Sequence, residues 1–303
     1  VGYSRDGGNH FGLVDIGTRE ELTGVDARRR DVLITAGSGT LYRSEDGGLH
    51  FRRVAHSFAE LKKRTFADQG SYAVCGGSEG TIYRYDLVTD KLSKIQLPPT
   101  GAAWQDAVSV RAARLVAIAM SRIGESETQL FRSINEGRSF VATARLPMTA
   151  AGLWMSRDGQ TVVVGTREGD VYRSVNGGGD FTLVYDSPSP TQSLSNSVMS
   201  INGSDRGELM VTLLHRSGAY FGSRHATDVL GSSNLGASFV LRAEGLMTDF
   251  GWNDPVSAVD FGGMHHGLLL GPDLLVTHNG GRTFRSARCR SSAGCWRRWS
   301  VLS

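Results

Sequence analysis

Short apolar runs separated by glycine-containing turns recur along the whole chain. In the stretch 151–186 this pattern predicts four strands, at 151–155, 161–165, 170–174 and 181–185, joined by Arg-Asp-Gly, Arg-Glu-Gly and Asn-Gly-Gly turns. Runs of this length between turn residues are typical of antiparallel strands. No stretch keeps the period of an amphipathic helix. The chain is therefore expected to be all-β.

The four-strand pattern returns in other parts of the chain, and we interpret each copy as one unit of a repeat. The further units are 19–55, 58–98, 103–147, 195–243 and 255–288. Residues 1–16 supply only the equivalent of a third and a fourth strand. The unit that ends near 243 is lengthened, and we predict a contact loop between 222 and 232.

A short motif repeats between the third and fourth strands of the units. Two examples are Tyr42–Phe51, with the sequence YRSEDGGLHF, and Phe131–Phe140, with FRSINEGRSF. The central acidic or amide residue recurs at intervals that average 45.5 residues over the six steps from 6 to 279: Asp6, Asp46, Asp86, Asn135, Asn176, Asn234 and Asn279. This is the length of a four-stranded blade in a β-propeller. We expect a propeller of seven blades, six complete and a partial one at the N-terminus.

The motif resembles the Asp-box, or BNR repeat, Ser-x-Asp-x-Gly-x-x-Trp/Phe. Its acidic or amide side chain can bind backbone amides and shape a hairpin, and its glycine accepts a positive φ. These residues are expected to be structural and to lie on the outer rim: Asp6, Asp46, Asn135, Asn176, Asn234 and Asn279. The copy around Asp86 lacks the glycines.

A propeller of about this size with these boxes resembles the photosystem II stability/assembly factor family. The resemblance implies a non-enzymatic protein of the thylakoid lumen, or its bacterial equivalent, that binds membrane-protein subunits. This chain departs from the pattern because its boxes end in Phe where Trp is more common, and because its C-terminal segment is rich in Arg and contains Cys.

The charge of the chain is unevenly distributed. The net charge is +3, but the segment from Arg282 onward holds six arginines and no acid, so the rest is faintly acidic. We expect a single propeller domain at 1–288 and a basic tail at 289–303, of which 295–302 could supply a closing strand. Such a tail favours an acidic or membrane-proximal partner surface.

Three cysteines are too few for a disulfide scaffold. Cys75 lies in an apolar run and is predicted to be a buried thiol, whereas Cys289 and Cys295 could pair locally. This usage hints at an extracytoplasmic compartment, such as the periplasm or the thylakoid lumen, and an organelle remains open. No apolar run is long enough to span a membrane as a helix.

Basic residues are the candidate contacts with partner proteins. Two runs lie in the inner parts of neighbouring units and could share one basic face: Arg28, Arg29 and Arg30, and Lys62, Lys63 and Arg64. The tail adds Arg285, Arg288, Arg290, Arg297 and Arg298. A further set recurs just before the box in consecutive units, as Arg43, Arg84, Arg132 and Arg173. That set could form an arc that grips carboxylates, but a structural role is the favoured interpretation.

A carbohydrate-active enzyme is the alternative function, because sialidases and other glycosidases also use Asp-box propellers. A glycosidase needs two carboxylates across a cleft, and the candidates at predicted inner strands are Asp26, Asp106 and Asp260. A sialidase would need an early Arg-Ile-Pro-type segment, and the nearest match, Arg145–Pro147, lies in mid-chain. A glycan-binding propeller without turnover is a third possibility.

Neither a metal nor another cofactor is expected. His265 and His266 are adjacent, so on a strand their side chains point to opposite faces. The glycines belong to box turns and lack the Gly-Lys-Ser/Thr context of a phosphate loop. The sequence therefore favours a non-catalytic interaction propeller, docked as a subunit or assembly/stability factor on a larger complex. Nucleic acid is not a favoured partner.

Overall fold

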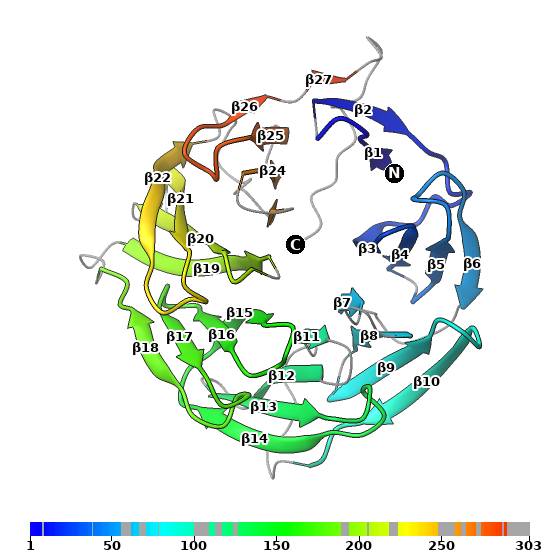
Figure 1. Cartoon of the computed structure of the whole chain (residues 1–303), viewed down its shortest axis with the longest axis horizontal. Helices are drawn as coiled ribbons and strands as arrows, with labels where there is room; N and C mark the ends of the chain where they lie inside the picture. The colour runs from blue at the N-terminus through cyan, green and yellow to red at the C-terminus, as the bar shows by residue number, and fades with distance from the viewer. Residues whose placement is uncertain are drawn as a thin grey trace.

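The computed structural model is built of strands arranged around a ring (Figure 1). It describes residues 1–7, 9–37, 39–55, 62–66, 71–77, 79–99, 109–112, 117–123, 127–188, 194–204, 206–217, 224–247, 258–261, 265–270, 274–286 and 288–289. In this part of the chain no helix is long and apolar enough to cross a membrane. The expectation of an all-β fold is confirmed.

Six four-stranded antiparallel sheets form the blades, and we number them in chain order. The first blade contains β3 (Leu22–Arg28), β4 (Asp31–Ala36), β5 (Leu41–Ser44) and β6 (Arg52–Ala55). The second contains β7 (Lys62–Phe66), β8 (Tyr72–Gly76), β9 (Thr81–Asp86) and β10 (Lys91–Gln96). The third contains β11 (Ser109–Ala112), β12 (Ala117–Ile123), β13 (Glu127–Ser133) and β14 (Val141–Leu146).

The other three blades repeat this order, with the first strand innermost and the fourth on the outer rim (Figure 1). The fourth blade contains β15 (Ala150–Met155), β16 (Val162–Thr166), β17 (Val171–Ser174) and β18 (Thr182–Tyr185). The fifth contains β19 (Leu194–Gly203), β20 (Leu209–Ser217), β21 (Arg224–Ser232) and β22 (Val240–Met247). The sixth contains β23 (Ala258–Phe261), β24 (Gly267–Leu270), β25 (Leu274–Thr277) and β26 (Arg285–Ser286).

A small three-stranded sheet lies between the sixth and first blades (Figure 1). Its strands are β1 (Gly2–Tyr3), β2 (His10–Leu13) and β27 (Arg288–Cys289). β1 pairs with β2 in antiparallel fashion, and β27 joins β2 in parallel. The two strands expected within residues 1–16 are thus present. The closing strand predicted at 295–302 lies outside the described residues.

The lengthened fifth blade corrects one expectation. We predicted a contact loop between 222 and 232, but Arg224–Ser232 is strand β21 and pairs along its whole length with β20. The four strands of this blade have 10, 9, 9 and 8 residues, against at most 7 in the other blades. The extra residues therefore extend the sheet, because each added residue gains a partner in the ladder.

The hydrophobic core lies between the faces of consecutive blades. Tyr72 and Ile82 of the second blade, for example, pack with Phe131 and Phe140 of the third in one buried cluster. Similar clusters join the third blade to the fourth and the fourth to the fifth. Each such side chain contributes about 1.5–3 kcal/mol by its burial. Cys75 is a fully buried thiol, as predicted, and is in no disulfide.

Candidate functional site

Each repeated motif forms a loop between two strands, the third and fourth strands in a blade or β1 and β2 in the small sheet, and we call these the rim loops. In the first blade the Oγ of Ser44 donates to Oδ1 of Asp46 (2.8 Å) and accepts from the backbone N of Gly48 (2.8 Å). Thr277 makes the same two contacts, with Asn279 and Gly281, at 3.0 Å each. A small hydroxyl side chain thus ties the end of the third strand to the turn.

The residue four positions after the Asp or Asn completes each loop. Where the loop has Asn, the amide Nδ2 donates to an acceptor at that position: Asn135 to Ser139, Asn176 to Asp180, Asn234 to Ser238 and Asn279 to Thr283. In two of the three loops that have Asp, the fourth residue is a histidine, and its Nδ1 lies 2.6 Å from the carboxylate: His10 on Asp6 and His50 on Asp46. In the third loop, around Asp86, the fourth residue is Asp90.

This pairing follows from hydrogen-bond chemistry. An amide can donate to a hydroxyl or carboxylate, whereas an ionised carboxylate can only accept and needs a donor such as imidazole. The hydrogen bonds from the side chain and backbone of His50 hold the pKa of Asp46 well below its usual range. The central residues were identified from the sequence, but their partners were missed, although the spacing of four residues is visible there.

The four recurring arginines connect consecutive blades. Three donate a hydrogen bond to the carbonyl oxygen of the residue that follows the Asp or Asn in the next rim loop: Arg43 Nη1 to Leu87 (3.0 Å), Arg84 Nε to Glu136 (2.8 Å) and Arg173 Nε to Leu235 (2.8 Å). The fourth, Arg132, lies directly over Gly177, the residue that follows Asn176 in the next rim loop. A Cβ atom added to Gly177 would overlap Nη1 of Arg132. These arginines are structural, and the alternative of a carboxylate-gripping arc loses its support.

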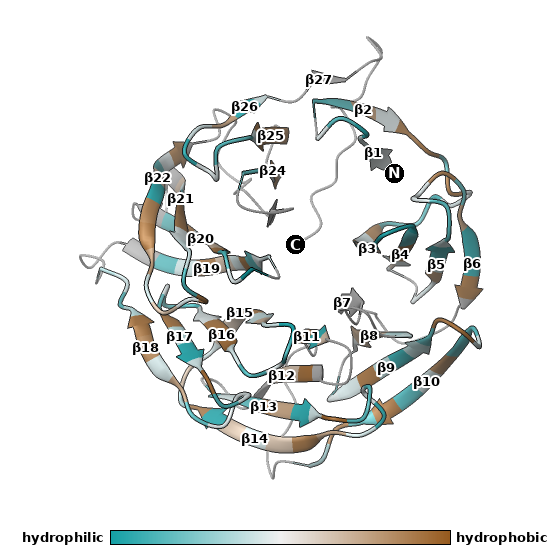
Figure 2. Cartoon of the chain, in the orientation of Figure 1, coloured by the Kyte–Doolittle hydropathy of each residue, from teal (hydrophilic) through white to brown (hydrophobic). Residues whose placement is uncertain are grey.

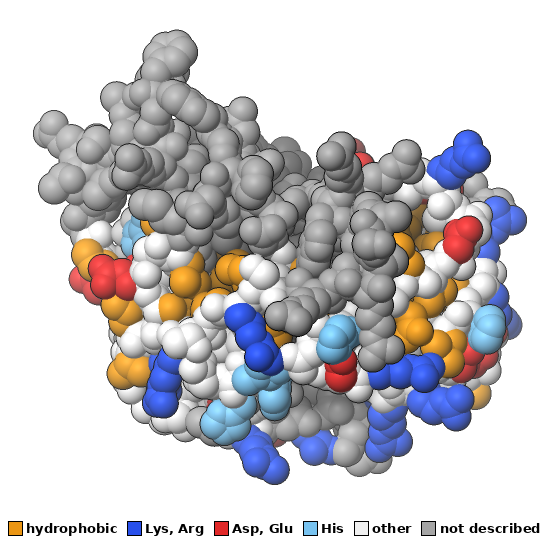
Figure 3. All heavy atoms as spheres, turned by 90° about the horizontal axis from the view of Figure 1, so that it is seen from above, with side chains coloured by type: hydrophobic (Ala, Val, Ile, Leu, Met, Phe, Trp, Pro, Cys, Tyr) orange, Lys and Arg blue, Asp and Glu red, His pale blue; other side chains and the backbone are white. Residues whose placement is uncertain are grey.

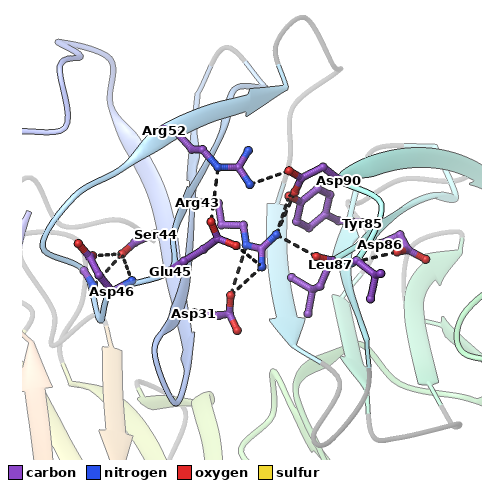
Figure 4. A network of polar contacts seen from close by, with 12 residues as sticks. Asp31, Arg43, Ser44, Glu45, Asp46, Arg52, Tyr85, Asp86, Leu87 and Asp90 are labelled. Carbon is purple, nitrogen blue, oxygen red and sulfur yellow. Dashed lines mark hydrogen bonds and ion pairs between the residues drawn. The ribbon is translucent and has the colours of Figure 1, made fainter.

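Arg43 is the centre of the polar network at the junction of the first two blades (Figure 4). Its side chain is 7% exposed and makes ion pairs of 2.9 Å with Asp31, Glu45 and Asp90. Three carboxylates thus surround one guanidinium. Charged hydrogen bonds of this kind are stronger than neutral ones, and they fix the two blades in one relative position.

Asp90 accepts hydrogen bonds from two further side chains in the same network (Figure 4). Arg52 donates to its Oδ2 at 2.7 Å, and the hydroxyl of Tyr85 donates to its Oδ1. Burial and the hydrogen bond to Asp90 raise the pKa of Tyr85 to about 12. The phenol therefore stays protonated at neutral pH and acts as a donor within the junction.

A second polar chain joins the fourth and fifth blades through His215. Its Nδ1 lies 2.7 Å from Oδ1 of Asn196 and its Nε2 lies 2.8 Å from Oδ2 of Asp228. The amide of Asn196 donates to Ser187 (2.7 Å), which leaves its oxygen facing the histidine. Both ring nitrogens face acceptors, an arrangement that favours the doubly protonated imidazole. The hydrogen bond to Asp228 accordingly raises the pKa of His215.

The basic segments predicted to contact partners are spread over the molecule. Arg28 ends β3, and Arg29 and Arg30 form the turn to β4, where the carbonyl of Arg30 accepts from Gly47 of the rim loop. Lys62, Lys63 and Arg64 begin β7, at the end where it pairs with the last residue of β8. Because the blades repeat one topology, the two segments lie at opposite ends of their inner strands. The structure therefore does not bring them together on one face.

The other candidate residues are described only in part. Arg285 is exposed on β26, and the backbone of Arg288 lies in β27. Arg290, Arg297, Arg298 and Asp106 lie outside the described residues. Asp26 lies on the innermost strand β3 and the backbone of Asp260 on the innermost strand β23, as expected. Among the described residues no group of three or more His, Cys, Asp or Glu could hold a metal ion.

Exposed apolar side chains gather at the rim of three consecutive blades, the third, fourth and fifth. They lie in the rim loops or in the first two residues of the outer strands, and we call them the apolar arc: Ile134, Val141, Val175, Leu183, Val240 and Leu241. Their exposure ranges from 46% to 73%. Figure 2 shows apolar segments on the outer strands β14, β18 and β22. Exposed apolar side chains that recur at one edge of consecutive blades are candidates for a protein-binding site.

Comparison with known proteins supports the fold. No protein-family profile and no curated protein matches the sequence. A structure of YCF48 from Cyanidioschyzon merolae matches with a TM-score of 0.59 and 14% identity, over 90% of this chain and 86% of that one. YCF48 bound to D1 peptide matches with a TM-score of 0.51 and 15% identity, over 93% and 96%. This chain has the β-propeller fold.

A third propeller extends the comparison beyond YCF48. The Cps50 (Swd1) β-propeller domain of Myceliophteria thermophila matches with a TM-score of 0.59 and 12% identity, over 88% of this chain and 86% of that one. At such identities the likeness extends to the fold alone. Function must therefore be argued from the surface of this propeller.

Proposed function

We propose that this chain is a non-catalytic protein-interaction propeller, a subunit or an assembly/stability factor docked on a larger complex. The apolar arc is the observation that carries the proposal. Six large apolar side chains, each at least 46% exposed, lie at one edge of three consecutive blades. Rigid blades hold these side chains in fixed positions, so little conformational entropy is lost when a partner covers them.

Two further points support an interaction role. The recurring arginines, which could have served as a substrate clamp, are used between blades instead. In addition, one propeller of similar fold, YCF48, is known in a complex with a D1 peptide. A role at a photosynthetic membrane complex is the specific form that the resemblance to the photosystem II assembly factors suggests. In this proposal the rim loops are Asp-boxes and the small sheet is a seventh blade.

The basic residues are proposed as secondary contacts with an acidic or membrane-proximal partner surface. Arg28, Arg29 and Arg30 form one group, Lys62, Lys63 and Arg64 a second, and Arg285, Arg288, Arg290, Arg297 and Arg298 a third, partly within the proposed tail 289–303. Replacing Arg290, Arg297 and Arg298 by Gln should weaken docking and reduce its salt dependence. Unchanged salt dependence would remove the tail from the interface.

The decisive experiment is native purification from the source, with mass spectrometry of co-migrating proteins. We expect a stoichiometric partner that is lost in the double variant Ile134→Ser/Val175→Ser. The matched control is Val88→Ser, because Val88 is 79% exposed but belongs to the second blade, outside the apolar arc. A monomer in all three preparations, or equal loss of the partner in the control, would contradict the proposal.

A carbohydrate-active enzyme is the second candidate, because Asp26 and Asp260 both belong to innermost strands. Turnover on a panel of glycosides that Asp260→Asn or Asp106→Asn abolishes would favour it. Binding of glycans without turnover would instead indicate a lectin-like propeller.

A further inference from the structure

Two histidines meet at the seam between the sixth blade and the small sheet. His266 precedes β24 and His278 follows β25, and their Nδ1 atoms lie 2.8 Å apart. The rings meet edge to face, with centroids 4.9 Å apart. The turn around Gly7 of the small sheet lies close to the Cε1 atom of His278. The pair thus lies at the surface of the seam, with His266 exposed and His278 half-buried.

A cavity of about 230 Å³ opens beside this pair. Val276 and Phe284 form an apolar wall of this cavity. Its polar lining consists of His278, Asn279, Thr283 and Arg285. This is enough room for a phosphate group with a small organic substituent, although it is below the usual size of a drug-sized ligand site.

The polar groups of the cavity are hydrogen-bond donors. The hydroxyl of Thr283 accepts from Asn279 Nδ2 (2.8 Å), so its own hydrogen remains available to donate. The guanidinium of Arg285 is anchored by Nη2, which donates to Oδ1 of Asn9. An arginine has five N–H donors, and this contact uses one of them.

His278 adds a buried ring nitrogen. Its Nε2 atom is buried and has no hydrogen-bond partner among the residues that the structure describes. Only one hydrogen can lie between the two Nδ1 atoms. When it belongs to His266, Nδ1 of His278 is the acceptor. The hydrogen of the neutral His278 ring must then lie on Nε2. A buried N–H without an acceptor costs about 1–3 kcal/mol, and a negatively charged oxygen would remove that cost.

The charge of the seam also favours an anion. Burial and the positive charge of Arg285 and His266 lower the pKa of His278. The acid on the neighbouring loop, Asp6, is already paired with His10 at 2.6 Å. Figure 3, which views the molecule from the side of β26, β27 and β2, shows His and Lys/Arg side chains gathered over this region.

We propose that this seam binds a phosphate group, either inorganic phosphate or the monoester of a small molecule. Arg285, Thr283 and His278 would donate to its oxygens, and Phe284 and Val276 would contact the substituent of an ester. Three donors suit the several oxygens of a tetrahedral anion better than the two of a carboxylate. The site lies away from the apolar arc, so it stands independently of the protein-binding role of that arc, although it shares Arg285 with the basic residues proposed as secondary contacts.

The test is a titration of inorganic phosphate followed by imidazole NMR signals of the full chain. We expect saturable shifts at His266 and His278, with binding weakened at least tenfold by Arg285→Gln and by His278→Asn. The matched control is Arg282→Gln, since Arg282 is an exposed arginine of the same rim loop and does not line the cavity. This control should change the affinity by less than twofold.

Two outcomes would overturn the proposal. One is a shift that grows linearly with phosphate and never saturates. The other is an equal loss in the Arg282 and Arg285 variants, which would indicate only the general charge of the surface. A parallel titration with phenyl phosphate identifies the source: tighter binding than inorganic phosphate indicates a monoester, and equal binding indicates the free ion. Thr283→Val, which removes a donor while keeping the shape, should weaken both ligands.

Discussion

Arg84 on β9 donates a hydrogen bond from Nε to the carbonyl oxygen of Glu136, 2.8 Å away in the rim loop of the next blade. Arg173 repeats this contact with Leu235 two blades further on. Glu136 and Leu235 have φ angles of +61° and +58°, so the backbone at both acceptors adopts the left-handed turn conformation. The junctions between blades thus depend on one arginine and one carbonyl in each case.

Arg84→Ala should destabilise the propeller by about 2–4 kcal/mol, because it removes a buried charged donor and leaves the carbonyl of Glu136 without it. Arg84 is only 6% exposed and also lies over the ring of Tyr72, at 5.1 Å from its centroid. The control is Arg145→Ala, whose ion pair with Glu127 is half exposed and should be worth less than about 1 kcal/mol. Chemical denaturation of both variants measures the difference, and equal effects would contradict it.

Two glycines of the rim loops separate the cost of backbone strain from the cost of a clash. Gly47 has φ +80° and open space where the methyl group of an alanine would stand, whereas Gly177 has φ +73° and lies under Arg132. Gly47→Ala should therefore cost about 1 kcal/mol, from strain alone. Gly177→Ala should cost about 1–3 kcal/mol more, because the methyl group displaces the guanidinium. Thermal or chemical denaturation of the two variants gives the comparison.

A double-mutant cycle tests that explanation. In an Arg132→Ala background, Gly177→Ala should cost no more than Gly47→Ala does in the native chain. An unchanged penalty in that background would show that the arginine is not responsible.

The partners of the rim-loop residues predict different effects on stability for the same Asn-to-Asp substitution at two positions. Asn176→Asp would place a second carboxylate 2.9 Å from Asp180, so the protein should lose about 1–2 kcal/mol at pH 7. Asn135→Asp would face the hydroxyl of Ser139, which can donate, and should be nearly neutral. Denaturation at pH 7 and pH 4 distinguishes the two variants, because protonation should restore only the first. Equal losses would contradict the pairing rule.

The chain through His215 predicts a defined pH dependence of stability. Its hydrogen bond to Asp228 raises the pKa of His215, with a smaller contribution from Glu244. The stabilisation is therefore complete below the unfolded value of 6.5 and is lost as the pH rises through the higher folded value. Burial alone would raise the pKa of Asp228, but hydrogen bonds from His215 and Gly245 lower it. Its contribution is present above 3.8 and is lost as the pH falls through the folded value.

The free energy of unfolding should thus contain a contribution from this pair that is greatest between about pH 4 and pH 6.5. His215→Gln should remove the decline above that range and should also reduce the loss of stability at acid pH, because His215 contributes to lowering the pKa of Asp228. NMR titration of His215 gives the folded pKa directly. A value at or below 6.5 would contradict the assignment of both ring protons.

The repeat could be predicted well from the sequence, because strands and turns are local features. The four strands predicted for 151–186 agree with β15 to β18 within about a residue at each end. The contact between His266 and His278 was not predicted, since it depends on register. Gly267 pairs with Thr277, which places the flanking histidines opposite each other. The alternation of side chains along one strand, which separates His265 from His266, carries no information about the neighbouring strand.

The interblade contacts were the other feature that local patterns could not give. The recurrence of Arg43 and its equivalents was visible, but each acceptor lies 44 to 62 residues further along the chain. A backbone carbonyl, moreover, has no signature in the sequence. The favoured structural interpretation was therefore correct in kind, and only the folded ring shows which atom each arginine binds.

The main-chain acceptor also bears on how such a ring could arise. Since a carbonyl oxygen belongs to every residue, an arginine from one blade can dock on the next without any matching side chain. A duplicated gene segment that encodes one blade would bring both the donor and the acceptor with it. The ring could then gain or exchange a unit in one genetic event, with the arginine–carbonyl contact already encoded at each new boundary.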